Sequence, residues 1–159
     1  MFRRKRAIEI RPAAKDGDIA DARALMKEYV SSLGREFSLQ EFARELAELP
    51  GVYAPPAGAL LLARCEGRLA GCVALRPLDG GACQMRRLFV RHQFRGKGVG
   101  KRLAVAAIAA AREAGHTLMR LEVAPWMAEA IAMYHAMGFR PSESHAVAGD
   151  FVAMELPLA

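Results

Sequence analysis

The order of hydrophobic and polar positions along the chain predicts alternating strands and helices. Short apolar or alternating stretches are typical of strands, whereas apolar residues repeated every three or four positions are typical of helices. The predicted strands span residues 7–11, 59–65, 68–75, 82–90, 117–123, 139–140 and 150–156. The predicted helices span about 16–33, 38–49, 99–114 and 127–137. This alternation indicates an α/β fold.

Local signals place the ends of the first two helices. Asp16 or Asp18 can cap the first helix, since a short carboxylate accepts hydrogen bonds from free backbone N–H groups. Ser38-Leu39-Gln40-Glu41 fits a capping box for the second helix, with Phe37 and Phe42 as its hydrophobic staple. Pro50-Gly51 stops that helix.

The connections between strands predict a mixed sheet. The strands at 59–65, 68–75 and 82–90 are joined by short glycine turns, so they must be antiparallel neighbours. The strand at 117–123 follows 82–90 through a helix, and such a crossover makes the two strands parallel.

Length and composition indicate one soluble domain covering residues 1–159. The chain has a mass of 17.3 kDa, 53% hydrophobic residues and a mean hydropathy of +0.07. No apolar run is long enough to cross a bilayer or to act as a signal peptide. The three cysteines, Cys65, Cys72 and Cys83, lack metal-site spacing and predict reduced thiols in the cytoplasm. An acyl-enzyme mechanism through Cys83 remains an alternative.

The net charge of +6 and pI near 9.7 raise nucleic acid as a partner. The positive residues gather in two places. Residues 1–6 contain a run of four basic residues and are expected to form a flexible basic tail. Residues 86–102 hold the second group, and no interleaved aromatic residues or nucleic-acid motif accompany it. We therefore expect this group to bind phosphates of a small molecule.

Gly96, Gly98 and Gly100 form a loop between a strand and a helix start. The first N–H groups of a helix have no intrahelical partner and carry the positive end of its dipole, so they bind anions. Glycine also lets the main chain approach a phosphate closely. Arg95, Lys97 and Lys101 add charge around the loop. The pattern predicts a diphosphate ligand.

Two common phosphate motifs do not fit this loop. A Walker A loop would need glycine at Arg95 and Ser or Thr at Arg102. A dinucleotide fingerprint would need a third glycine at Lys101. Neither a nucleoside triphosphate nor a dinucleotide is therefore indicated.

The order Gln93-x-x-Gly96-x-Gly98, then Leu121-Glu122-Val123, then the helix and Gly-Phe of residues 130–139 resembles the GNAT family of N-acetyltransferases. The close match covers about residues 82–139. The resemblance implies a GNAT-like α/β domain with a mixed, mostly antiparallel sheet and about four flanking helices. A splayed pair of parallel strands would form the acetyl-CoA cleft.

The resemblance implies acetyl-CoA as cosubstrate and no metal. By position, the backbone groups of Leu88, Phe89 and Val90 would pair with the pantetheine arm. The pyrophosphate would lie on the backbone N–H groups of the glycine loop, with the charge of Arg95 beside them. The loop residues concerned are Gly96, Lys97, Gly98, Val99, Gly100 and Lys101.

Tyr134 matches the family's tyrosine, which protonates the departing sulfur. A phenol with a pKa of about 10 is a suitable donor to a thiolate. The alternative is a core tyrosine on a helix face. Glu122 stands where one branch of the family has a glutamate base, acting directly or through water. The alternative is an ion pair with Arg87 or Arg120. Gln84 stands where many relatives have a glutamate base, and an amide cannot accept a proton in that way.

The sequence thus predicts an acetyl-CoA-dependent N-acetyltransferase that works by direct attack in a ternary complex. In the family, the region of the first two helices lines the acceptor side, and the acceptor would be an amine-bearing small molecule or peptide. Met127 replaces an asparagine that contacts pantetheine in many relatives. The alternative function is a catalytically weak sensor or regulatory module that binds CoA or acyl-CoA. Homodimers are frequent in the family, but no exposed apolar stripe identifies an interface here.

Overall fold

The computed structural model describes residues 7–33, 39–142 and 151–159. The expected basic tail at 1–6 lies outside these residues. So do Phe37 and Ser38, which belong to the predicted staple and capping box.

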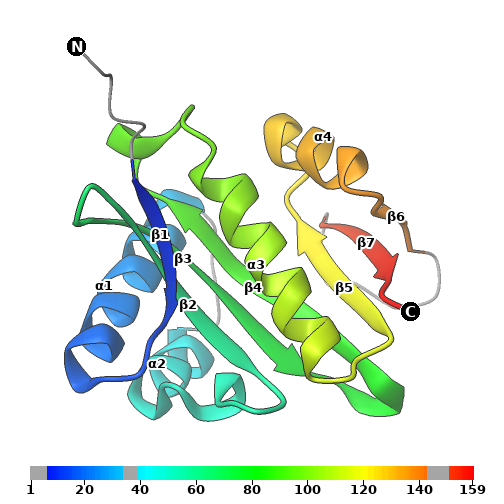
Figure 1. The fold of residues 1–159 in the computed structure, drawn as a ribbon, viewed down its shortest axis with the longest axis horizontal. Coiled ribbons are helices and arrows are strands. Elements are labelled where there is room, and N and C mark those ends of the chain that lie inside the picture. Colours follow the sequence, from blue (N-terminus) through cyan, green and yellow to red (C-terminus); the bar gives the residue numbers. More distant parts are fainter. Residues whose placement is uncertain (1–6, 34–38, 143–150) are drawn as a thin grey trace.

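Within the described residues, a seven-stranded sheet has the order β1-β2-β3-β4-β5-β7-β6 (Figure 1). Its strands are β1 (Ile8–Pro12), β2 (Ala59–Cys65), β3 (Arg68–Pro77), β4 (Ala82–Val90), β5 (Leu118–Val123), β6 (Arg140–Pro141) and β7 (Val152–Pro157). The helices are α1 (Asp16–Leu33), α2 (Leu39–Glu48), α3 (Val99–Glu113) and α4 (Ala128–Ala136). The predicted elements are all present, with ends shifted by one or two residues.

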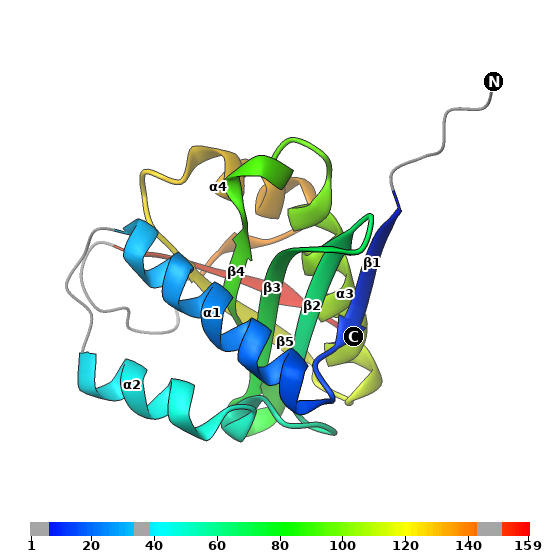
Figure 2. The same ribbon diagram turned by 90° about the vertical axis from the view of Figure 1, so that its left-hand side faces the viewer.

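The sheet separates two apolar layers. Figure 2 shows α1 and α2 on one side of the sheet and α3 and α4 on the other. Alternate residues of a strand point to opposite faces. Leu61 and Val73 pack in the layer of α3, whereas Leu62 and Cys72 pack in the layer of α1 and α2. No helix among the described residues is long and apolar enough to span a membrane.

The pairing of β4 determines where a ligand can enter. β1 to β4 are antiparallel neighbours, as expected from their short turns. β4 pairs with β5 in parallel, but only from Ala82–Leu118 to Gln84–Arg120. β4 continues to Val90 without a ladder partner on that side among the described residues. The splayed parallel pair implied by the GNAT resemblance is therefore present.

A β-bulge, which the sequence pattern did not indicate, interrupts β4. Cys72 pairs with Phe89 and Ala74 pairs with Arg86, so Arg87 and Leu88 together lie opposite one residue of β3. Arg87 has a φ of 60°, and the Cys72 thiol donates a hydrogen bond of 3.4 Å to its carbonyl. A bulge bends the strand that contains it. This bend accompanies the separation of β4 from β5.

Neither candidate is the N-cap of α1, because the Lys15 carbonyl accepts the first intrahelical bond, from the Ile19 N–H at 3.0 Å. Asp18 instead stabilises the start of the helix from its first turn. Its carboxylate accepts hydrogen bonds from the N–H groups of Lys15 and Ala14, at 3.2 and 3.1 Å. These bonds lower the pKa of Asp18. The segment after α2, predicted as a loop from residue 52, begins with a short 3-10 turn, Gly51–Tyr53. Tyr53 is buried beneath α2.

Candidate active site

A cleft of about 80 Å³ lies where β4 and β5 separate. Both strands and α4 form its walls. Its apolar side chains are Met85, Leu88, Leu121, Val123, Met127 and Ala130. The edge of β4 that faces it, from residue 85 to 90, has backbone groups without a strand partner on the β5 side. Apolar walls beside an open strand edge fit an extended chain with amide groups, such as the pantetheine arm.

The glycine loop has the geometry of an anion site. Gly96 and Gly98 have φ values of 75° and 85°, which side chains disfavour. Gly98 is the N-cap of α3. The Arg102 N–H bonds to the Gly98 carbonyl at 3.1 Å, so the N–H groups of residues 99–101 precede the first intrahelical bond. A Cβ added at Gly96 or Gly98 would meet nothing within 4 Å. The space over this loop is open to a phosphate.

Arg95 is held against the end of β4, and Lys97 lies near the ring of Phe94 in the turn that follows. The Arg95 Nε donates to the Val90 carbonyl at 3.0 Å, and its guanidinium lies 6.0 Å from the Phe89 ring centre. The Lys97 ammonium lies 5.6 Å from the Phe94 ring centre. The Val90 carbonyl thus has a partner in the protein, and its contact with pantetheine stays a prediction.

Tyr134 lies on the wall of the cleft and in the core at once. It is 6% exposed and packs edge-on against Phe139, with 5.5 Å between ring centres. Burial, with a smaller effect from Tyr29, raises the pKa of Tyr134. The phenol therefore keeps its proton at neutral pH. The two interpretations of this residue, core tyrosine and proton donor, are compatible.

Glu122 projects from the opposite face of β5 to Leu121 and Val123. It is exposed and lines both the cleft and an adjoining pocket of about 110 Å³. Among the described residues it makes no ion pair, since the one carboxylate that Arg87 contacts belongs to Glu45. The structure therefore gives no support to the alternative that Glu122 pairs with Arg87 or Arg120.

Cys83 lies apart from the cleft. It is fully buried in the layer of α3, and burial raises the pKa of its thiol to about 11. A thiol in this environment is a poor nucleophile because the thiolate is the reactive form. These properties argue against an acyl-enzyme mechanism through Cys83.

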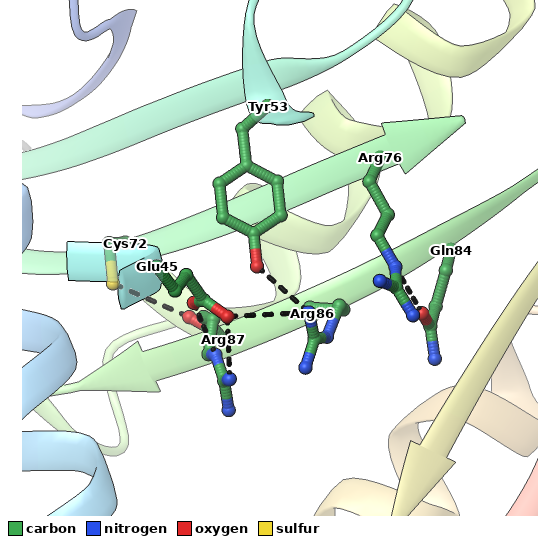
Figure 3. A network of polar contacts seen from close by, with 7 residues as sticks. All are labelled: Glu45, Tyr53, Cys72, Arg76, Gln84, Arg86 and Arg87. Atoms are coloured by element: carbon green, nitrogen blue, oxygen red, sulfur yellow. Dashed lines mark hydrogen bonds and ion pairs between the residues drawn. The ribbon is translucent and has the colours of Figure 1, made fainter. Parts of the chain in front are cut away.

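A polar network on the α2 side of the sheet was not anticipated (Figure 3). Arg87 donates two hydrogen bonds of 2.9 Å to Glu45 on α2. Arg86 donates to the Tyr53 hydroxyl at 3.1 Å and lies 3.4 Å from Glu45. Burial alone would raise the pKa of Glu45, but the bonds and charge of Arg87 outweigh it and hold that pKa below its usual range.

Gln84 belongs to the same network and is 8% exposed. Its side-chain oxygen accepts a hydrogen bond of 2.7 Å from the Arg76 Nε. The side chain at the position of the family's glutamate base is thus hydrogen-bonded to an arginine. The sequence signal for this network was a polar residue at alternate positions of otherwise apolar strands, at 76, 84 and 86.

Residues 22–139 match the model of the acetyltransferase (GNAT) family. This chain belongs to the GNAT family. The matched region of this GNAT chain contains the cleft, the glycine loop, Glu122 and Tyr134.

Relatives and solved structures agree with the assignment. The GNAT chain is 35% identical over 130 residues to an uncharacterised N-acetyltransferase of Schizosaccharomyces pombe, covering 80% of each protein. A GNAT acetyltransferase from Staphylococcus aureus has a similar fold, with a TM-score of 0.81 and 17% identity over 96% of this chain and all of that one. The yncA protein of Salmonella typhimurium, solved with its cofactor acetyl-CoA, has a TM-score of 0.68 and 23% identity over 96% and 95% of the two chains.

Proposed function

We propose that this protein transfers the acetyl group of acetyl-CoA to an amine by direct attack in a ternary complex. The observation that carries the proposal is the cleft between β4 and β5, with the buried phenol of Tyr134 on its wall and the exposed carboxylate of Glu122 at its edge. The acetyl-CoA in the yncA structure, which shares this fold, supports the choice of cofactor.

The residues present fit acetyl-CoA. The free N–H groups at the start of α3 and the open space over Gly96 and Gly98 would hold the pyrophosphate. The unpaired edge of β4 at Leu88 and Phe89 would hold the pantetheine arm. When bound there, acetyl-CoA supplies an acetyl group activated as a thioester.

Two side chains would move the protons. Glu122 would take a proton from the acceptor amine, directly or through a water molecule, because only the neutral amine attacks. A nitrogen–carbon bond forms and the carbon–sulfur bond breaks. Tyr134 would give its phenolic proton to the departing sulfur and regain one from solvent. Burial keeps the phenol protonated until the sulfur departs, but it also makes the transfer more costly because the transfer leaves a buried phenolate, so prompt reprotonation is needed.

A thermal-shift titration with acetyl-CoA, CoA and ATP tests the cofactor. Ligand that binds only the folded state raises apparent stability, by about 2.7 kcal/mol at a hundred times its dissociation constant. We expect a saturable shift with acetyl-CoA and CoA and little with ATP. No shift with millimolar acetyl-CoA would overturn the proposal.

Thiol release from acetyl-CoA across a panel of amines then separates the two candidate functions. An enzyme releases thiol only when an acceptor amine is present. Saturable binding without turnover on any amine would favour the sensor or regulatory module instead.

A further inference from the structure

Arg86 lies where three hollows meet. It lines the cleft between β4 and β5 and the pocket of about 110 Å³ beside Glu122. It also lines a pocket of about 160 Å³ between α2, Tyr53 and Arg76. The acetyl transfer proposed above uses neither Arg86 nor Arg76, so the position of these two arginines needs another explanation.

The pocket that Arg76 and Arg86 line also contains Arg44 and three glutamates, Glu41, Glu45 and Glu48, so its formal charges balance. Neither Arg76 nor Arg86, however, has a short ion pair with a described residue. Among the described residues, Glu45 is the one carboxylate bonded to Arg86 and Arg87, and it makes its two short bonds of 2.9 Å to Arg87. Arg86 is left with the Tyr53 hydroxyl at 3.1 Å and with Glu45 at 3.4 Å. Arg76 bonds to the neutral amide of Gln84 and has no ion pair with any described residue. Figure 3 shows these guanidinium groups extending in the same direction from the sheet.

Partial burial makes these weakly paired charges costly. Burial first, and then the nearby charge of Arg86, lower the pKa of Arg76. The Nε of Arg120, whose strand position is paired with Gln84, is buried and has no hydrogen-bond partner among the described residues. Buried donors and charges without partners are unfavourable until a ligand satisfies them. An anion in the adjoining pockets would complement Arg76 and Arg86, whereas Arg120 lines none of these pockets.

A carboxylate shares the cleft and the adjoining pocket with Arg86, although not with Arg76. Glu122 lines both the cleft and the pocket that contains Arg86, and it makes no ion pair with a described residue. A ligand with an ammonium group near Glu122 and an oxyanion near Arg86 would complement both. The planar guanidinium matches a carboxylate with two parallel hydrogen bonds.

We propose that the acceptor is a small amine that carries a carboxylate, as an amino acid does. Arg86 and Arg76 bind the carboxylate, and the amine lies beside Glu122 at the cleft. This inference rests on the proposed acetyl transfer. The neutral side chain of Gln84 is needed for this site, because a glutamate at this position would form an ion pair with Arg76 and neutralise its charge.

The test compares amino acids with their carboxamides, which keep the amine but lose the negative charge. We expect wild-type kcat/KM to be higher for the acid. Arg86→Met and Arg76→Met should each lower kcat/KM for the acid about ten- to a hundredfold, the range for a hydrogen bond to a charged group, with little change for the amide. Arg11→Met is the control, because Arg11 is an exposed arginine on the edge strand β1. It removes one positive charge far from the cleft and should change kcat/KM for neither the acid nor the amide. Arg86→Lys should restore part of the preference.

Gln84→Glu gives a second test that keeps all the arginines. The new carboxylate would pair with Arg76, so we expect a smaller preference for the acid with an unchanged thermal midpoint of the free protein. Phosphonate analogues of the same amino acids distinguish a carboxylate site from a site for phosphate-like groups. Better use of the phosphonates would overturn the assignment of a carboxylate.

Binding separates this inference from the proposed function. With CoA present, the acids should stabilise the wild-type protein in a saturable manner, and Arg86→Met should abolish the effect. Such binding without turnover would overturn the proposed function and keep the carboxylate site. Turnover of amides as fast as acids, or an acid preference that survives both arginine substitutions, would overturn the carboxylate site and keep the acetyl transfer.

Discussion

Tyr134 is both a core residue and the proposed proton donor. Its ring is buried against Phe139, and burial raises the pKa of its hydroxyl. The packing around the ring therefore keeps the hydroxyl protonated, which the proposed role requires before the transfer.

Tyr134→Phe tests the proton donor. The substitution keeps the ring and removes only the hydroxyl, so we expect kcat to fall about ten- to a thousandfold with little change in acetyl-CoA affinity. Steady-state kinetics and a cofactor titration measure the two quantities. The thermal midpoint is the control for folding, and a variant with wild-type turnover would remove Tyr134 from the mechanism.

Motif spacing led to the predictions of Tyr134 and Glu122, whose catalytic roles stay predictions, but it did not lead to the arginine network. Strict alternation along β4 would place Arg87 and Phe89 on the face of Met85, which packs towards α3. The bulge adds one residue, so Arg87 bonds to Glu45 on α2 and Phe89 packs in the layer of α1. A single inserted position exchanges the two faces of a strand, and no local pattern marks this one.

At the scale of elements, the loop and the start of α3 act as one unit. Gly98 caps the helix in a left-handed conformation that only glycine adopts at low cost, and this conformation exposes the first N–H groups. The prediction of an anion site was based on this local chemistry, and the structure has the left-handed glycine and the free N–H groups that the prediction requires.

Gly98→Ala should destabilise the fold by about 1–2 kcal/mol, because a left-handed conformation is unfavourable with a Cβ. We also expect acetyl-CoA affinity to fall by at least about tenfold, equivalent to about 1.4 kcal/mol, since the methyl group would lie where the phosphates approach. Urea unfolding and a cofactor titration measure these effects.

Gly67→Ala is the matched control for this variant. Gly67 has a φ of 80° in the turn between β2 and β3, and a Cβ there would also meet nothing within 4 Å. It should cost similar stability and leave cofactor affinity unchanged. Equal loss of affinity in both variants would mean that Gly98 acts only through the fold.

The bulge depends on the strand beside it. A Cβ at Gly71 would clash with the carbonyl oxygen of Phe89, which belongs to the backbone and cannot move away freely. Gly71→Ala should therefore destabilise the protein by about 1–3 kcal/mol. Gly17→Ala in α1, where a Cβ meets nothing within 4 Å, should be neutral or stabilising. Urea unfolding of both variants measures the difference, and an unaffected Gly71→Ala would show that the strands can separate without cost.

At the scale of the whole molecule, the Glu45–Arg87 ion pair joins the helical layer to the sheet. Its side chains are 14% and 9% exposed. Breaking a buried pair typically costs about 3–5 kcal/mol, so Glu45→Gln should lower stability at neutral pH by about 3 kcal/mol. Glu48→Gln, an exposed position on the same helix, should have little effect.

The same pair should make the protein sensitive to acid. The folded pKa of Glu45 lies below its ordinary value of 4.5. The stability it contributes is therefore complete above that value and is lost as pH falls towards the folded pKa. Unfolding measured from neutral pH down through this window should show the wild-type advantage over Glu45→Gln shrinking. Parallel pH curves for the two proteins would contradict the assignment.

The fold as a whole followed from the sequence because short turns and a helical crossover leave few topologies. The arginine network, which we propose to be the acceptor side, did not follow, because it is built from side chains of α2, β3 and β4 that lie far apart in the chain. Their meeting depends on packing across the sheet, which no spacing rule describes.

The division of β4 has an evolutionary consequence. In the proposed complex its main chain holds the cofactor, while Cys83 and Met85 fill the core and Gln84 and Arg86 face the acceptor pockets. Substitutions at these last two positions can change which amine is selected without touching the groups that hold acetyl-CoA or the core. Descendants of such a gene could therefore gain new acceptor substrates through substitutions at a few positions, while the cofactor site and the core stay unchanged.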